Sequence, residues 1–122
     1  MPNAYDRIRA ELAKAEVAEP SESLPHLRAV LEETGRLLDE QLAKAVVDEE
    51  LSIRAAGAGA GLTENAVGPR LGRTAMLGAY ARPDGRVTAE EVRRARYDKA
   101  RGESPTPAGA AKPMRFKPRR ST

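Results

Sequence analysis

The sequence contains no cysteine, a single histidine and only four aromatic residues, none of them tryptophan. The lack of cysteine excludes disulfides, thiolate zinc sites and a cysteine nucleophile. The single histidine, His26, argues against a histidine-based metal site or a serine–histidine relay within one chain, and we expect it at the surface. The glycines of residues 57–61 lack the preceding strand and the Lys-Ser/Thr pair of a phosphate-binding loop. We therefore expect no enzyme activity, no catalytic residue, no cofactor and no metal.

Long hydrophobic runs are also missing from the chain. No segment approaches the roughly 18 apolar residues that a membrane span requires, and the N-terminus has no apolar stretch typical of a secretory signal. We expect no membrane association and a cytoplasmic, nucleoid-associated location. The apolar residues are mostly alanine, leucine and valine, which can build only a small core. Marginal stability as a monomer, or dimerisation to enlarge the core, is the expected consequence.

Charge is abundant but unevenly distributed. Residues 1–50 carry 6 basic and 12 acidic side chains, residues 51–100 carry 9 and 5, and residues 101–122 carry 6 and 1. An acidic first part followed by a basic second part is typical of a nucleic-acid-binding protein with an acidic support region. The other interpretation is a solvated surface on which charge is simply uneven.

The first 50 residues are predicted to form two helices. Asn3 can cap a helix over residues 3–19, in which apolar residues recur at spacings of three and four. The segment Pro20-Ser21-Glu22-Ser23 should break it, with Ser23 capping a second helix of about 25 residues from Leu24. Gly35 leaves room for close packing on that helix. Its wide apolar stripe predicts contact with the first helix and with a second copy of the chain.

Residues 52–73 are predicted to form two more short helices, after a break near residues 48–52 in which Asp48 or Ser52 caps the next helix. Gly61 suits the left-handed residue that ends a helix, and Thr63 is a good N-cap for the following one. Because residues 55–61 read AAGAGAG, this segment could instead be a flexible linker. The flanking sequence favours a helix, in which small residues would let the two helices cross closely.

Several residues of this segment fall where bacterial helix-turn-helix proteins usually have them, namely Arg54, Gly61, Leu62, Thr63, Val67 and Leu71. Residues 52–71 therefore resemble a generic helix-turn-helix of that class, without identifying a particular regulator family. The resemblance implies that the second helix enters the major groove of DNA. Gly57 and Gly59 in the first helix, and Gly68 with Pro69 in the second, depart from the pattern.

The second helix of this pair is predicted to run from Glu64 to about Thr74. If Val67 and Leu71 face inward, a turn of 100° per residue leaves the outward positions Asn65, Pro69, Gly72 and Arg73. Asparagine and arginine are the residue types that read adenine and guanine edges. Pro69 removes one helical hydrogen bond, so the helix should either kink there or be shorter.

The next segment has two interpretations. Arg82-Pro83-Asp84-Gly85 is strong turn chemistry, so residues 77–88 could form a short β-hairpin wing with Arg82 and Arg86 at its tip. The alternative is a loop that leads directly into the next helix. Thr88 and Glu91 form a capping-box pattern, which predicts a basic helix that ends at Gly102.

Residues 103–122 are predicted to be disordered, because they combine four prolines with little apolar content and no periodicity. Their basic residues could track a phosphate backbone or enter the minor groove, or the segment could be a solubilising tail. These basic residues are Lys112, Arg115, Lys117, Arg119 and Arg120.

Taken together, the sequence predicts a mostly α-helical protein with three parts: an acidic support and dimerisation region (1–50), a helix-turn-helix region (51–102) and a disordered basic tail (103–122). The expected function is DNA binding, as a small transcriptional regulator or a nucleoid- or plasmid-type protein that forms a homodimer through residues 1–50. The alternative is a helical protein-interaction module whose basic surface docks on an acidic partner. The candidate DNA-binding residues are those of the basic tail together with Arg54, Thr63, Asn65, Arg70, Arg73, Arg82 and Arg86.

Overall fold

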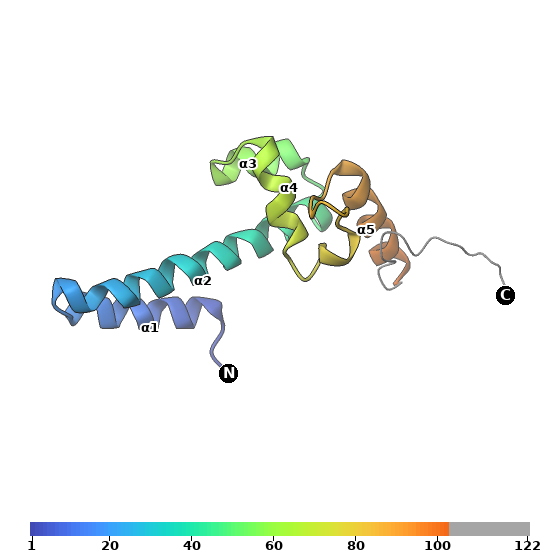
Figure 1. The fold of residues 1–122 in the computed structure, drawn as a ribbon. Coiled ribbons are helices and arrows are strands. Elements are labelled where there is room, and N and C mark those ends of the chain that lie inside the picture. Colours follow the sequence, from blue (N-terminus) through green and yellow to red (C-terminus); the bar gives the residue numbers. More distant parts are fainter. Residues whose placement is uncertain (103–122) are drawn as a thin grey trace. The chain divides into compact units, whose positions relative to one another are not determined.

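The computed structural model describes residues 1–102 (Figure 1), and over this range the chain is all-α, which confirms the helical part of the predicted mostly α-helical fold. No strand occurs within the described range. The helices are α1 (Ala4–Val17), α2 (Pro20–Val47), α3 (Ile53–Ala60), α4 (Glu64–Gly72), a 3-10 helix η1 (Gly78–Tyr80) and α5 (Ala89–Arg101). None of them has both the length and the apolar character needed to cross a membrane.

The chain divides into two compact units, an N-terminal unit of residues 1–38 and a C-terminal unit that begins at residue 39. Helix α2 contributes residues to both. The division falls before the change of charge at residue 50, because the end of α2 buries Leu42, Ala43, Val46 and Val47. These four residues belong to the core of the C-terminal unit.

The N-terminal unit consists of α1 and the first part of α2. The predicted cap of α1 is confirmed: the Asn3 side chain accepts a hydrogen bond from the Asp6 backbone N–H at 2.9 Å. The predicted start of α2 at Leu24 was wrong, since the helix begins at Pro20. Proline has no N–H to leave unsatisfied in the first helical turn, and the Ser23 hydroxyl donates to the Pro20 carbonyl at 2.8 Å instead of capping.

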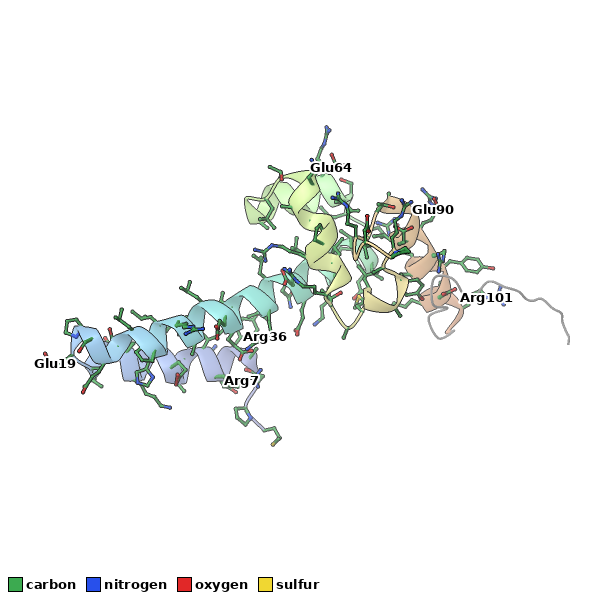
Figure 2. All side chains as sticks on the ribbon, in the orientation of Figure 1. Arg7, Glu19, Arg36, Glu64, Glu90 and Arg101 are labelled. Atoms are coloured by element: carbon green, nitrogen blue, oxygen red, sulfur yellow. The ribbon has the colours of Figure 1, made fainter. Side chains whose placement is uncertain are left out.

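Polar contacts join α1 to α2 in this unit. Arg7 and Arg36 each approach the Glu33 carboxylate at 3.1 Å, and both arginines are labelled in Figure 2. The hydrogen bond from Arg7 holds the pKa of Glu33 below its ordinary value. His26, expected at the surface, is partly exposed and lies 3.2 Å from the Glu11 carboxylate, which lowers the pKa of Glu11. The Arg7–Glu33 and His26–Glu11 contacts thus connect α1 to α2, whereas Arg36 and Glu33 both lie on α2.

Apolar burial in the N-terminal unit is slight. Of residues 1–38, the single buried apolar side chain is Ala15. Close packing at Gly35 is not seen, because a Cβ placed there would meet no atom within 4 Å. Large apolar side chains remain exposed, including Tyr5, Leu12, Val17, Leu24, Leu27 and Leu31.

The C-terminal unit opens with the link between α2 and α3. The predicted break near residues 48–52 is confirmed, and Ser52 caps α3 by accepting a hydrogen bond from the Ala55 N–H at 3.0 Å. Arg96 donates to the carbonyls of Val46 and Leu51 at 2.8 and 3.2 Å. These bonds fasten the link to α5.

Helices α3 and α4 pack closely across a tight turn. Gly61 ends α3 in the left-handed conformation, and Thr63 caps α4 by accepting from the Ala66 N–H at 3.3 Å. A Cβ on Gly57 would lie only 2.8 Å from Cγ2 of Val67. Residues 53–60 are therefore a helix rather than a linker, and the absence of a side chain at Gly57 allows the two helices to approach.

Helix α4 continues through Pro69 and ends at Gly72, two residues before the expected end. Beyond it, the Thr74 hydroxyl donates to the Leu71 carbonyl at 2.7 Å and accepts from the Leu77 N–H at 3.1 Å. These bonds satisfy the helix end and start a new turn that leads into η1.

The hairpin wing over residues 77–88 is absent. This segment forms η1 and a turn closed by a bond from the Arg82 N–H to the Arg86 carbonyl at 2.9 Å. The loop then lies on α4, where the Val87 N–H donates to the Gly68 carbonyl at 3.1 Å. The backbone of this loop hydrogen-bonds to α4 instead of pairing as a second strand.

Helix α5 closes the unit. As predicted, Thr88 and Glu91 form a capping box and Gly102 ends the helix in the left-handed conformation. The Tyr80 hydroxyl donates to the Asp98 carboxylate at 2.8 Å, and the Arg94 guanidinium lies 5.6 Å from the centre of the Tyr80 ring. These contacts hold η1 against α5 and bury Tyr80.

Candidate functional site

The exposed face of α4 is the first part of the candidate site. Asn65 in its first turn and Arg73 just beyond its end are both exposed, as the helix geometry predicts. The prediction that Gly72 lies on this open face was wrong. A Cβ on Gly72 would lie 2.0 Å from the Gly85 carbonyl oxygen, so the position is covered. The loop after η1 covers Gly72, so the open face of α4 is narrower than expected and carries Asn65, Pro69 and Arg73.

Two of the arginines predicted to contact DNA, Arg70 and Arg82, form ion pairs within the C-terminal unit. Arg70 forms an ion pair with the largely buried Asp39 at 2.7 Å, and Arg73 reaches the other oxygen of that carboxylate only at 3.8 Å. Arg82 lies 3.2 Å from Glu91. Arg70 and Arg82 are therefore paired within this unit, whereas the Arg73 side chain is 65% exposed.

Glu91 is a buried carboxylate at the start of α5. It accepts from both the N–H and the hydroxyl of Thr88, at 2.7 and 2.6 Å, and from Arg82. Burial raises the pKa of Glu91, but these hydrogen bonds outweigh that effect and hold the pKa below its ordinary value. Glu91 is thus ionised near neutral pH and fixes the position of the loop that precedes α5.

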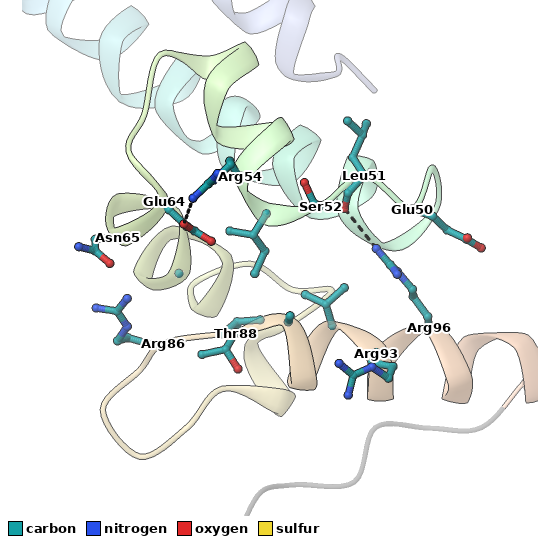
Figure 3. A pocket seen from close by; sticks show the side chains of 15 residues that line it. Glu50, Leu51, Ser52, Arg54, Glu64, Asn65, Arg86, Thr88, Arg93 and Arg96 are labelled. Carbon is teal, nitrogen blue, oxygen red and sulfur yellow. Dashed lines mark hydrogen bonds and ion pairs between the residues drawn. The ribbon is translucent and has the colours of Figure 1, made fainter.

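A pocket of about 490 Å³ borders the first turn of α4 (Figure 3). It is lined by the start of α3, the start of α4, the loop before α5 and the first two turns of α5. Four arginines contribute to its lining, namely Arg54, Arg86, Arg93 and Arg96. Glu50 and Glu64 are its acidic residues, and the rest of the lining is largely apolar.

The four arginines differ in how their guanidinium groups are used. Arg54 lies 3.7 Å from Glu64, and Arg96 donates to the Leu51 carbonyl, the two interactions that the dashed lines of Figure 3 mark. Within residues 1–102, the side chains of Arg86 and Arg93 have neither an ion pair nor a hydrogen bond. Arg86 extends over α4, where its guanidinium atoms lie 3.6 and 3.7 Å from the position of a Cβ on Gly68.

Arg93 and Arg96 were not among the site residues expected from the sequence. A usable signal was present, because Ala89, Val92, Arg93 and Arg96 follow the spacing that places residues on one face of a helix. Because α5 carries other arginines that lie elsewhere, such as Arg94 over Tyr80 and Arg101 over Tyr97, the sequence alone did not show which of its arginines share a face with Val92. Of the remaining predicted site residues, Thr63 caps α4. The five basic residues of the tail lie outside the described residues.

In the part of the chain that the structure describes, no group of three His, Asp or Glu side chains is placed to hold a metal ion. In comparisons with known protein families, curated proteins and solved structures, nothing matches this chain.

Proposed function

We propose that the chain binds DNA, with α3, the turn at Gly61 and α4 acting as a helix-turn-helix. The observation that carries this proposal is the exposed face of α4, which presents Asn65 in its first turn and Arg73 at its end. An asparagine amide can bond both N6 and N7 of adenine, and an arginine can do the same for O6 and N7 of guanine. A small cytoplasmic, nucleoid-associated transcriptional regulator or plasmid-type protein is the corresponding class.

Cations surround this face. Arg54 at the start of α3 and Arg86 in the loop both line the pocket beside the first turn of α4, and this position supports phosphate contacts by these two arginines. Phosphate contacts set the orientation of a protein on the duplex, whereas base contacts give sequence preference. Thr63 contributes through the α4 cap, and the basic tail would add affinity that depends on salt.

The test is selection of bound fragments from a genomic library, followed by titration of the selected duplex with the Asn65→Ala/Arg73→Ala double variant. We expect a loss of at least about tenfold, because a good bidentate base contact discriminates by roughly 1–3 kcal/mol. Arg28→Ala is the matched control, since this arginine is similarly exposed but lies in the N-terminal unit. Unchanged affinity in the double variant would reject α4 as the reading helix.

We further propose that the first 50 residues carry a homodimer contact. The support is the row Leu24, Leu27 and Leu31 on α2, spaced three and four apart and exposed. Leu24→Gln/Leu31→Gln should lower the mass measured by light scattering from that of a dimer to that of a monomer. A monomeric wild-type chain would contradict this contact.

The same exposed leucines favour a second candidate function, a helical protein-interaction module whose basic C-terminal unit docks on an acidic partner. A gel shift with random and genomic DNA at two salt concentrations separates the two functions. Absence of DNA affinity at low salt would favour the interaction module.

A further inference from the structure

The pocket beside α4 combines cationic and apolar groups in a way that suits a particular class of ligand. Its volume of about 490 Å³ is that of a site for a small molecule, which usually occupies several hundred cubic ångströms. Among its apolar lining residues, Ile53 and Ala89 expose surface, whereas Val87 and Val92 are almost fully buried. The guanidinium groups of Arg86 and Arg93 have no bonded partner within residues 1–102.

We propose that this pocket binds a small organic anion, with a carboxylate or phosphate at the arginines and an apolar body against Ile53 and Ala89. A planar guanidinium bonds both oxygens of such a group, and the interaction is stronger than one between neutral groups. The apolar wall then stabilises the body of the ligand by removing both surfaces from water.

The charge of the lining supports an anion. The pocket has four arginines against Glu50 and Glu64, and Glu64 is already paired with Arg54. The starts of α3 and α4 are capped by Ser52 and Thr63, so the guanidinium groups, rather than free backbone N–H groups, would bind the anion. The basic segment from residue 101 onward carries like charge and is a poor occupant.

The site also has fixed geometry. Arg96 is held by two backbone carbonyls, and the loop that carries Arg86 is bonded to α4 through Val87 and Gly68. Because these bonds hold the backbone around the pocket, binding requires the ordering of only the two free arginine side chains. A preorganised pocket loses less affinity to such ordering than a flexible one.

The experiment is a titration of the full chain followed by amide chemical shifts, with benzoate and phenyl phosphate as probes. Acetate supplies the anion without the ring, and benzyl alcohol supplies the ring without the charge. We expect the two aromatic anions to shift the amides of Ile53, Gly68 and Val87 saturably. Acetate and benzyl alcohol should bind at least about tenfold more weakly, because each lacks one of the two contacts.

The Arg86→Gln/Arg93→Gln variant should bind benzoate at least about tenfold more weakly, since two charge-assisted contacts are lost. Arg9→Gln/Arg28→Gln removes the same charge from the N-terminal unit and should bind as the wild type does. The single variant Arg93→Gln changes only an exposed position of α5 and leaves the loop that carries Arg86 intact. Its affinity for benzoate should also fall below that of the wild type. Retained affinity in the double variant would overturn the proposal.

Equal binding of acetate and benzoate would also overturn it, because the arginines would then be a general anion or backbone-phosphate contact with no use for the apolar wall. The titration contains no DNA, so its result is independent of the proposed DNA binding. Failure of one proposal is therefore distinguishable from failure of the other.

Discussion

The two units of this chain bury their apolar residues to very different extents. In the C-terminal unit, Leu71, Leu77, Val46, Val67 and Val87 are almost completely enclosed, whereas in the N-terminal unit Leu31 remains 75% exposed. The ion pairs of the N-terminal unit lie at its surface, where they contribute little to stability in water. The difference indicates that apolar packing stabilises the C-terminal unit, whereas the N-terminal unit leaves large apolar side chains exposed.

The largest effect should come from removing a core side chain of the C-terminal unit. Leu71→Ala should cost about 2–5 kcal/mol of unfolding free energy, because a fully buried leucine leaves a cavity on replacement. Leu31→Ala, the matched change in the N-terminal unit, should stay within about 0.5 kcal/mol when the chain is monomeric. Denaturant titration at low protein concentration measures both.

Repeating both measurements at several protein concentrations tests whether a second copy of the chain covers Leu31. If a second copy covers Leu31, the cost of Leu31→Ala should grow with protein concentration, since dimerisation stabilises only the folded state. The cost of Leu71→Ala should not change in this way. A large, concentration-independent cost at Leu31 would show that the N-terminal unit buries more than its structure indicates.

The next effect tests the close contact between α4 and its covering loop. Gly72→Ala should destabilise by about 3 kcal/mol, because its Cβ would lie 2.0 Å from the Gly85 oxygen and the loop would have to move. Gly59→Ala is the control in the same unit, since a Cβ there meets nothing within 4 Å. Thermal unfolding of both variants decides the point, and similar melting temperatures would contradict the contact.

A smaller effect is expected at Glu91. Glu91→Gln should cost about 1–2 kcal/mol near neutral pH, because the ionised carboxylate accepts three bonds from Thr88 and Arg82, and Arg82 is partly screened by water. The pKa of Glu91 is lowered in the folded chain. Its contribution is therefore present above the ordinary glutamate pKa and is lost as pH falls through the lowered value.

Unfolding of the wild type and of Glu91→Gln across a series of pH values measures this contribution. The two stabilities should converge in acid. A difference that persists unchanged below the folded pKa of Glu91 would assign the loss to packing rather than to charge.

Local chemistry made much of the fold predictable. The caps at Asn3, Thr63 and Gly61 involve neighbours within a few residues, and each was identified from residue type and spacing alone. The start of α2 was missed because two of its residues are proline, and a pattern of breakers does not show that Pro20 occupies the first helical position. Turn residues likewise suggested a wing, although strong turn chemistry suits a loop equally well.

The candidate site was less predictable because its residues depend on partners far away in sequence. The exposure of Asn65 follows from the helix geometry. The coverage of Gly72 by Gly85 and the ion pair of Arg70 with Asp39 do not, because they involve residues far apart in sequence. Counting arginines could not separate those that stabilise the fold from those left free. Only the folded arrangement distinguishes Arg82, paired with a buried carboxylate, from Arg86, which is not.

The smallest effect, with the opposite sign, is expected at Gly35 of the N-terminal unit. Gly35→Ala should stabilise the chain by about 1 kcal/mol, because alanine favours a helix interior and its Cβ would meet no atom within 4 Å. Denaturant titration at low protein concentration measures the gain. A loss that grows with protein concentration would place a second helix against Gly35, which continues the stripe of Leu24 and Leu31. The sign of this one change thus separates an open face of α2 from a closely packed one.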